Sequence, residues 1–245
     1  WTHRVMMIRI DDFTDRNLGW PIPRDQYGAV MTLLSNSGAT AIALDVPLPP
    51  RERTDSTEEA RMIQYLQNAQ GVFQVVGPFI PSRTVQEKIS SRDVDSSAHF
   101  VIGQFGIPAP KGNLFPRSPF INDYPFPELA DVSAGVGHIS IIPDTLDGVI
   151  RSAPLFVEYA GRLYPTLGLA LSMHERGLTA KDLQFEVGDG SMTVTVGGVE
   201  IPTGPIGEVN INYVGAPDVF PSVGFYDILV AARDRNAAFF EQFRD

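Results

Sequence analysis

The segment covering residues 5–46 constrains the fold more than any other part of this chain. It reads VMMIRIDDFTDRNLGWPIPRDQYGAVMTLLSNSGATAIALDV, in which two short apolar runs flank a turn-rich loop and an amphipathic run. The runs 6–10 and 40–44 are typical of strands that are buried on both faces. Apolar residues recur at helical spacing over 29–34, and Ser37-Gly38 provides a helix stop. The pattern predicts a right-handed crossover unit in which the two strands are parallel.

Acidic residues follow both of these predicted strands. Asp11 and Asp12 come after the first strand, and Asp45 comes after the second. Parallel strands place their carboxyl ends at one edge of a sheet, and open α/β sheets bind ligands at that edge. The three acids could hold a hard cation such as Mg²⁺ or Ca²⁺. Alternatively, they cap helices and anchor loops, or they pair with Arg24 and Arg151 in an internal electrostatic clamp.

The loop after the first strand, residues 15–24, carries two prolines and a tryptophan. The prolines fix the backbone and remove hydrogen-bond donors, which excludes a strand interior or a helix centre. Asp25 is a candidate N-cap for the helix that follows. Trp20 is interpreted either as a plug over the sheet edge or as a ligand contact.

The next part of the chain continues the alternation of helix and strand. A helix is expected from 57–60 until Gly71, and a third buried strand over 72–76. Residues 77–126 are rich in proline and show no sustained helical period, so we expect a long excursion over the sheet edge with a strand near 100–105.

The second half of the chain is dominated by strand patterns. The expected elements are a short helix at 128–134, antiparallel strands at 135–142, 149–159 and 162–164, a helix opened by Pro165 that is buried all round, a meander over 185–201, a strand at 209–214, and helices at 223–233 and 236–243. The fold class is therefore α/β, a mixed sheet with parallel βαβ units in the N-terminal half and a strand-rich, largely antiparallel second half. With no flexible linker and no repeat, residues 1–245 are expected to form a single domain.

Composition limits the function classes. The formal net charge is -10 and no basic tract occurs, which argues against nucleic acid as a partner. The absence of cysteine excludes disulfides and thiolate chemistry. No apolar run approaches the roughly 18 residues that span a bilayer. No cofactor is indicated.

Catalytic motifs are missing from the sequence. No nucleophile elbow, phosphate-binding loop, dinucleotide fingerprint or His-Glu-x-x-His motif occurs. His138 lies in a predicted strand and is interpreted as a hydrogen-bonded core or edge histidine, with pH sensing as the alternative. Asp147-Gly148 is mainly a turn signal and falls short of a calcium loop.

Several short motifs follow one another across nearly the whole chain. They are Ile10-Asp11-Asp12, Leu18-Gly19-Trp20-Pro21 with Pro23-Arg24, Gly38-Ala39, Leu44-Asp45-Val46, Gly135-Val136-Gly137-His138, Pro143-Asp144, Asp147-Gly148-Val149 with Arg151, Tyr164-Pro165, Asn210-Ile211-Asn212-Tyr213, Gly215, Phe220-Pro221 and Tyr226-Asp227-Ile228-Leu229. In this order they resemble the second class of CHASE domains, the cyclase- and histidine-kinase-associated sensory extracellular domains. Ile22 stands where that family usually has a second aromatic residue. The chain ends at Asp245, before the family's Lys-Ile-Val-type strand, so we expect the last parallel strand to be cut off.

The resemblance implies a bacterial receptor input module held outside the cytoplasmic membrane, in the periplasm. Such modules are non-catalytic and drive a cytoplasmic output, most often an adenylate or guanylate cyclase, otherwise a protein kinase or a diguanylate cyclase. The implied partners are an unknown small ligand or signal and the receptor's own transmembrane helices and output domain, and homodimer formation stays open. We expect the sensing crevice to contain Asp11, Asp12, Trp20, Arg24 and Asp45, completed by Asp147 and Arg151.

Two other classes of function compete with a sensor. A structural module that dimerises receptors or docks a partner would need no small ligand. A metal-assisted hydrolase would use the strand-end aspartates.

Overall fold

The chain forms two compact units in the computed structural model, which describes residues 5–49, 56–77, 96–111, 115–118, 121, 123–141, 147–187, 192–216 and 218–244. The first unit comprises Trp1–Ile42, Arg51–Val72 and Asn212–Asp245, and the second comprises Ala43–Pro50 and Phe73–Ile211. The family of elements is mixed α/β, with parallel strand pairs early in the chain and antiparallel ones later, so the predicted fold class is confirmed.

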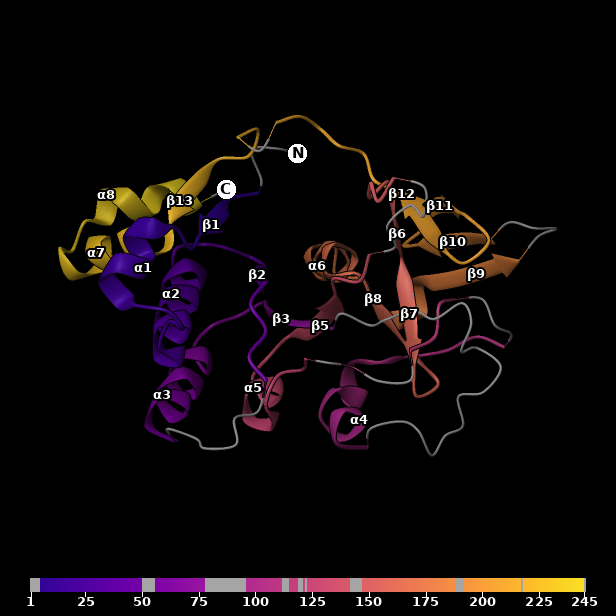
Figure 1. Cartoon of the computed structure of the whole chain (residues 1–245), viewed down its shortest axis with the longest axis horizontal. Helices are drawn as coiled ribbons and strands as arrows, with labels where there is room; N and C mark the ends of the chain where they lie inside the picture. Colours follow the sequence, from indigo (N-terminus) through magenta and orange to yellow (C-terminus); the bar gives the residue numbers. More distant parts are fainter. Residues whose placement is uncertain are drawn as a thin grey trace. The chain divides into compact units, whose positions relative to one another are not determined.

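The first unit combines a pair of parallel strands with helices (Figure 1). Its elements are β1 (Met7–Arg9), α1 (Asp12–Leu18), α2 (Arg24–Asn36), α3 (Ser56–Leu66), β13 (Ser222–Gly224), α7 (Phe225–Arg233), α8 (Ala237–Phe240) and a final 3₁₀ turn (Glu241–Phe243). β1 and β13 are parallel, with Met7 opposite Ser222. Segments from the two ends of the chain thus build one pair of strands.

Helices α2 and α3 pack closely because a glycine lies at their contact. A methyl group added at Gly28 would lie 2.9 Å from the Cα atom of Met62. Met62 and Leu66 of α3 are fully buried, as the helical spacing predicted. The hydroxyl of Thr32 donates to the carbonyl of Tyr65 at 2.9 Å and ties the two helices together at their other end.

The second unit holds most of the strands. The sheet β2-β3-β5 joins Ile42–Leu44, Val72–Val76 and Gly135–His138, and β3 and β5 are parallel. The remaining elements are α4 (Ser96–Ile102), a 3₁₀ turn (Gly103–Phe105), β4 (Ile107–Pro108), α5 (Pro127–Asp131), β6 (Ser152–Pro154), β7 (Phe156–Tyr159), β8 (Arg162–Pro165), α6 (Leu167–Glu175), a 3₁₀ turn (Ala180–Asp182), β9 (Leu183–Val187), β10 (Met192–Val196), β11 (Val199–Thr203) and β12 (Glu208–Asn210). The strands β4-β8-β7, β12-β6 and β11-β10-β9 form three antiparallel sheets.

Two glycines make the turn of the predicted meander. Gly197 and Gly198 link β10 to β11 with φ values of 56° and 79°. A two-residue hairpin turn of this type needs positive φ at both positions, which glycine adopts without strain. The other predicted turn of the meander, at 188–190, lies outside the described residues.

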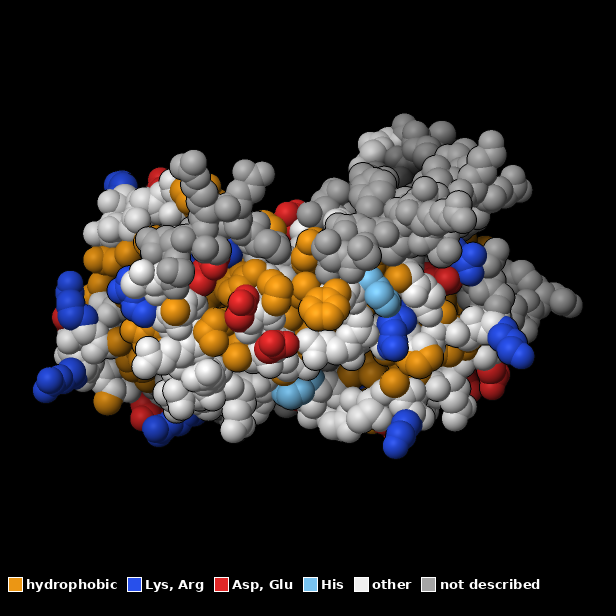
Figure 2. All heavy atoms as spheres, turned by 90° about the horizontal axis from the view of Figure 1, so that it is seen from below, with side chains coloured by type: hydrophobic (Ala, Val, Ile, Leu, Met, Phe, Trp, Pro, Cys, Tyr) orange, Lys and Arg blue, Asp and Glu red, His pale blue; other side chains and the backbone are white. Residues whose placement is uncertain are grey.

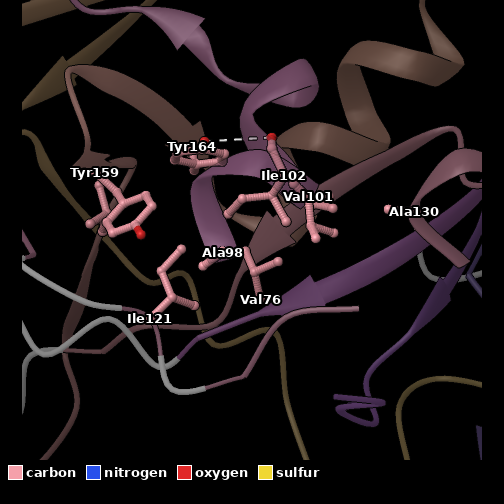
Figure 3. Close-up of a cluster of buried hydrophobic side chains, with 10 residues drawn as sticks. Val76, Ala98, Val101, Ile102, Ile121, Ala130, Tyr159 and Tyr164 are labelled. Carbon is pink, nitrogen blue, oxygen red and sulfur yellow. Dashed lines mark hydrogen bonds between the residues drawn. The ribbon is translucent and has the colours of Figure 1, made fainter. Parts of the chain in front are cut away.

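A buried apolar cluster fills the second unit beside β3 and β5 (Figure 3). Val76 of β3 meets Ala98, Val101 and Ile102 of α4, while Tyr159 and Tyr164 close the cluster from β7 and β8. The hydroxyl of Tyr164 donates to the carbonyl of Ile102 at 3.5 Å. Burial of these apolar side chains is the main source of stability for this unit.

Several predictions in the N-terminal part were wrong. The first strand is not buried on both faces: Met7 is 49% exposed. It pairs with β13 and lies in a different sheet from β2, so the predicted β1–β2 crossover unit is not found among the described residues. The predicted loop 15–24 is partly helix, because α1 runs to Leu18, and the N-cap of α2 is Pro23, not Asp25.

Four predictions later in the chain also need correction. Residues 100–105 are helical, in α4 and the 3₁₀ turn after it, not a strand. The strand at the start of 135–142 pairs with β3 in parallel, not antiparallel. Helix α6 buries Ala170 and Met173 alone, so its apolar circumference is not fully covered. Residues 222–224 form a strand, which places the start of α7 at Phe225.

Candidate functional site

Asp11 lies directly after β1 and caps helix α1. Its Oδ1 atom accepts hydrogen bonds from the backbone N–H and from the hydroxyl of Thr14, both at 2.9 Å. These bonds, with the backbone one as the larger cause, lower the pKa of Asp11 below its ordinary value. Asp11 is therefore a stable carboxylate at the carboxyl end of the strand.

The second strand of the pair ends in the same manner. Gly224 ends β13 and is the N-cap of α7. A methyl group added at Gly224 would lie 2.6 Å from Oδ2 of Asp227 and 3.2 Å from Oδ2 of Asp11. Two carboxylates from distant parts of the chain therefore meet over Gly224, at the carboxyl edge of β1 and β13.

Aromatic and hydroxyl contacts hold the two helices at this edge. The rings of Phe13 and Tyr226 meet edge to face with centroids 5.4 Å apart. The backbone N–H of Tyr226 donates to the hydroxyl of Thr14 at 3.3 Å. Thr14 is fully buried and so connects the cap of α1 to the start of α7. The positions of Asp11 and Asp227 are consequently fixed by packing as well as by the backbone.

Asp12 and Trp20 are both exposed. Asp12 is the first residue of α1. The side chain of Trp20 is 65% exposed, which excludes the interpretation of this residue as a plug over the sheet edge. The Trp20–Pro21 peptide bond is cis. An exposed indole ring is available to contact a ligand.

Arg24 is a buried residue of the first unit. It is 2% exposed, and its Nη1 atom bonds Oε1 of Glu59 on α3 at 2.5 Å. Its backbone N–H donates to Glu58 at 3.1 Å. Nearby, Asp25 pairs with Arg61 at 3.5 Å. The arginine thus joins the start of α2 to the start of α3.

Asp45 directly follows β2 in the second unit, as predicted. The residue reaches solvent, yet it is surrounded by enough protein that desolvation raises the pKa of its carboxyl group. A raised pKa makes this acid easier to protonate than the capping acid Asp11.

Asp147 and Arg151 form an exposed ion pair in the second unit. The guanidinium bonds both carboxylate oxygens of Asp147, at 2.9 and 2.7 Å. The bond from Arg151, followed by one from the backbone N–H of Val149, lowers the pKa of Asp147. Both side chains are about half exposed, at 47% for the acid and 55% for the arginine, so the pair closes a surface turn.

The seven predicted site residues divide between the two units. Asp11, Asp12, Trp20 and Arg24 belong to the first unit, and Asp45, Asp147 and Arg151 to the second. Both arginines form ion pairs, with Glu59 and Asp147, which are not the strand-end acids of the clamp hypothesis.

Sequence analysis missed one acid of the first-unit edge, Asp227. The run Gly224-Phe225-Tyr226-Asp227 follows a strand in the same way as Ile10-Asp11-Asp12 does. This signal went unused because residues 222–224 were assigned to a helix.

Surface features give no sign of a multivalent metal or phosphate site in the described part of the chain. Among those residues, no group of three or more histidine, cysteine or acidic side chains could hold a metal ion. On the face drawn in Figure 2, basic side chains are dispersed among neutral and apolar ones and do not gather in one patch. No described helix has the length and apolar character needed to cross a membrane.

Comparison with known proteins identifies one family. A family model described as the CHASE2 domain matches residues 1–245, the whole chain. No curated protein and no solved structure matches.

Proposed function

The chain belongs to the CHASE2 family, and we propose that it serves as the extracytoplasmic sensory domain of a bacterial transmembrane receptor. CHASE2 domains are extracellular sensory domains found in receptors. The match along the entire chain is the observation that carries the proposal, because it leaves no part of residues 1–245 to another kind of domain.

The proposed ligand site is the carboxyl edge of β1 and β13 in the first unit. Two parallel strands end there, each is followed at once by a helix, and each helix starts with an acid: Asp11 and Asp12 on α1, and Asp227 on α7. Ligands of α/β proteins bind at this edge of parallel strands. Trp20, exposed in the loop between α1 and α2, adds an aromatic surface for the ligand.

The other predicted site residues receive supporting roles in this proposal. Arg24 is buried in its pair with Glu59 and holds α2 against α3. Asp45 and the Asp147–Arg151 pair belong to the second unit, where they are proposed as further contacts for the signal.

The receptor's response is proposed to follow from a shift between two conformations. A ligand that binds one conformation more tightly than the other changes their populations, and the change passes to the cytoplasmic output. The proposed output is a nucleotide cyclase, with a protein kinase or diguanylate cyclase as the alternative. The chain itself carries no catalytic role in this proposal.

A thermal-shift screen tests the ligand site. The 245-residue chain is screened against divalent cations, amines, amino acids and small anions. A compound that binds the native state raises the melting temperature by mass action, by an amount that grows with its concentration. The screen is repeated with Asp11→Ser, which keeps a helix cap but removes the carboxylate, and with Asp12→Asn.

Asp234→Asn is the matched control, because Asp234 is an exposed acid at the opposite end of α7. We expect at least one compound to raise the melting temperature of the wild type and the control, and to lose its effect in Asp11→Ser and Asp12→Asn. Equal shifts in all four proteins would contradict the site. No shift with any compound, together with concentration-dependent dimerisation, would favour the structural module. Turnover that requires Mg²⁺ or Mn²⁺ would favour the hydrolase.

A further inference from the structure

The carboxyl end of β5 in the second unit carries a buried histidine. His138 is the last residue of β5, lies opposite Val76 of β3 and is 1% exposed. Side chains alternate along a strand, so His138 lies on the same face as Val136. Val136 and Val76 both belong to the apolar cluster of Figure 3. The imidazole is therefore placed at the border of the apolar core.

A hydrogen bond defines the protonation state of this ring. The backbone N–H of Ser140 donates to Nδ1 of His138 at 3.1 Å. An imidazolium ion carries a proton on both nitrogens and cannot accept this bond. The bond thus requires a neutral ring with the proton on Nε2. Ser140 is itself 2% exposed, so the bond folds the chain after β5 back into the protein.

The start of helix α6 lies against the same end of β5. Thr166, the N-cap of α6, forms an isolated bridge with His138. A methyl group added at Gly137 would lie 2.4 Å from the Cα atom of Leu167, so the two backbones touch. Helix N-termini carry partial positive charge, which opposes a second positive charge on His138.

Charged groups on the elements packed against β5 are engaged elsewhere. β3, with the sequence VFQVV, has no ionisable side chain. On β8, the guanidinium of Arg162 donates to the carbonyl of Gly106 at 2.7 Å, and the hydroxyl of Tyr164 donates to that of Ile102. On α6, Glu175 ends the helix.

The histidine of α6 is also turned to another partner. His174 stacks against Phe73, with ring centroids 5.2 Å apart, and Phe73 lies on the face of β3 opposite Val76. Among the described residues, the surroundings of His138 thus offer apolar side chains and a helix N-terminus, and burial lowers the pKa of its imidazole to about 3.

We propose that His138 and Ser140 form an acid-sensitive latch, in which protonation of the imidazole breaks the Ser140 N–H to Nδ1 bond and opens the carboxyl end of β5. The proton is taken from solvent when the end of the strand opens, because an exposed histidine titrates near its ordinary pKa of about 6.5. An extracellular domain meets the pH of its surroundings directly, so the latch gives this receptor a response to acid. The inference goes beyond the proposed ligand site and stands independently of it.

Hydrogen exchange tests the latch. The protection of the Ser140 amide is measured by NMR on the 245-residue chain from pH 6 to pH 4, relative to an unstructured peptide at the same pH. The amide of Val194, buried in β10, reports exchange through wider unfolding. One linked proton predicts that Ser140 protection falls about tenfold per pH unit. Val194 should remain more strongly protected than Ser140 at each pH.

The variant His138→Asn removes the titration and keeps an acceptor close to the position of Nδ1. In this variant we expect the pH dependence of Ser140 protection to be lost, whereas His174→Asn, a change at the exposed histidine, should leave it as in the wild type. The same fall in His138→Asn, or equal protection of Ser140 and Val194 throughout, overturns the latch. If His138→Asn does not fold, the imidazole ¹⁵N shifts of the wild type decide: titration near pH 6.5 with Ser140 still protected contradicts the proposal.

Discussion

The two units end their parallel strands in opposite ways. In the first unit, the strands β1 and β13 lead to carboxylates of Asp11 and Asp227, which cap or border helices and remain charged. In the second unit, β5 leads to His138, which is buried, neutral and bonded to the next turn of chain. The same place in a fold therefore carries an exposed charge in one unit and a buried neutral base in the other.

The difference shows that the end of a parallel strand becomes a ligand site only where its polar groups reach solvent. An exposed carboxylate binds a ligand without first being uncovered. A buried imidazole responds to a proton only when the surrounding structure opens, so its titration is coupled to conformation. The first edge is suited to recognition, and the second to a conformational response.

Removing one partner of the buried ion pair in the first unit should have the largest effect. Glu59→Gln takes the carboxylate away from Arg24, whose guanidinium is 2% exposed, and should destabilise the chain by about 3 kcal/mol. Asp147→Asn, in the exposed pair of the second unit, should cost roughly 0.5 kcal/mol. Urea unfolding of both variants measures the contrast. Equal losses would show that burial does not separate the two pairs.

A methyl group at the contact of β5 and α6 should destabilise the second unit. Gly137→Ala would force two backbones apart, because the new carbon would lie 2.4 Å from Leu167 Cα, and we expect a loss of about 3 kcal/mol. Gly168→Ala, one residue into the same helix, meets nothing within 4 Å and should stabilise by about 0.5–1 kcal/mol. Thermal unfolding compares the two. A neutral Gly137→Ala would contradict the close contact.

Acid should weaken the second unit through His138. Its pKa is lowered in the folded chain, so between about pH 3 and pH 6.5 the unfolded chain binds the extra proton. Stability from this residue is complete above pH 6.5 and falls below it, by about 2 kcal/mol at pH 5. The measurement is the difference in unfolding free energy between pH 7 and pH 5 for the wild type and for His138→Asn. A difference that does not change in the variant would remove His138 from the account.

Loss of the cap on α1 should have the smallest effect. Asp11→Ala removes the acceptor for both bonds from Thr14 and should cost about 1 kcal/mol, whereas Asp11→Ser should recover most of this loss. Circular dichroism with urea titration compares the two variants. If Asp11→Ser were as unstable as Asp11→Ala, the carboxylate would have a structural role beyond capping.

Local patterns in the sequence predicted the elements whose neighbours lie close in the chain. The helix stop at Ser37-Gly38, the buried strand over 72–76 and the Gly197-Gly198 turn each follow from residues in immediate sequence. Pairing between distant segments could not be predicted in the same way. β1 pairs with β13 more than two hundred positions later, and nothing local distinguishes that partner from β2.

The candidate site shows the same limit. Asp11 and Asp12 were found because they follow an apolar run, and the structure places them at a strand end. Asp227 was missed because the three-residue strand before it is too short to show an alternating pattern. The burial of His138 was anticipated as a core or edge position, but its bond to Ser140 depends on a backbone turn that no side-chain pattern encodes.

Hydrogen-exchange mass spectrometry with and without a compound that stabilises the chain in the thermal-shift screen tests the central claim most directly. The account predicts slower exchange in peptides covering the starts of α1 and α7, residues 11–18 and 222–233, when the compound is bound at pH 7. Peptides covering 192–203 in the β10–β11 hairpin serve as the reference. Protection confined to the second unit, with no change at α1 and α7, would contradict the assignment of the sensing site to the carboxyl edge of β1 and β13.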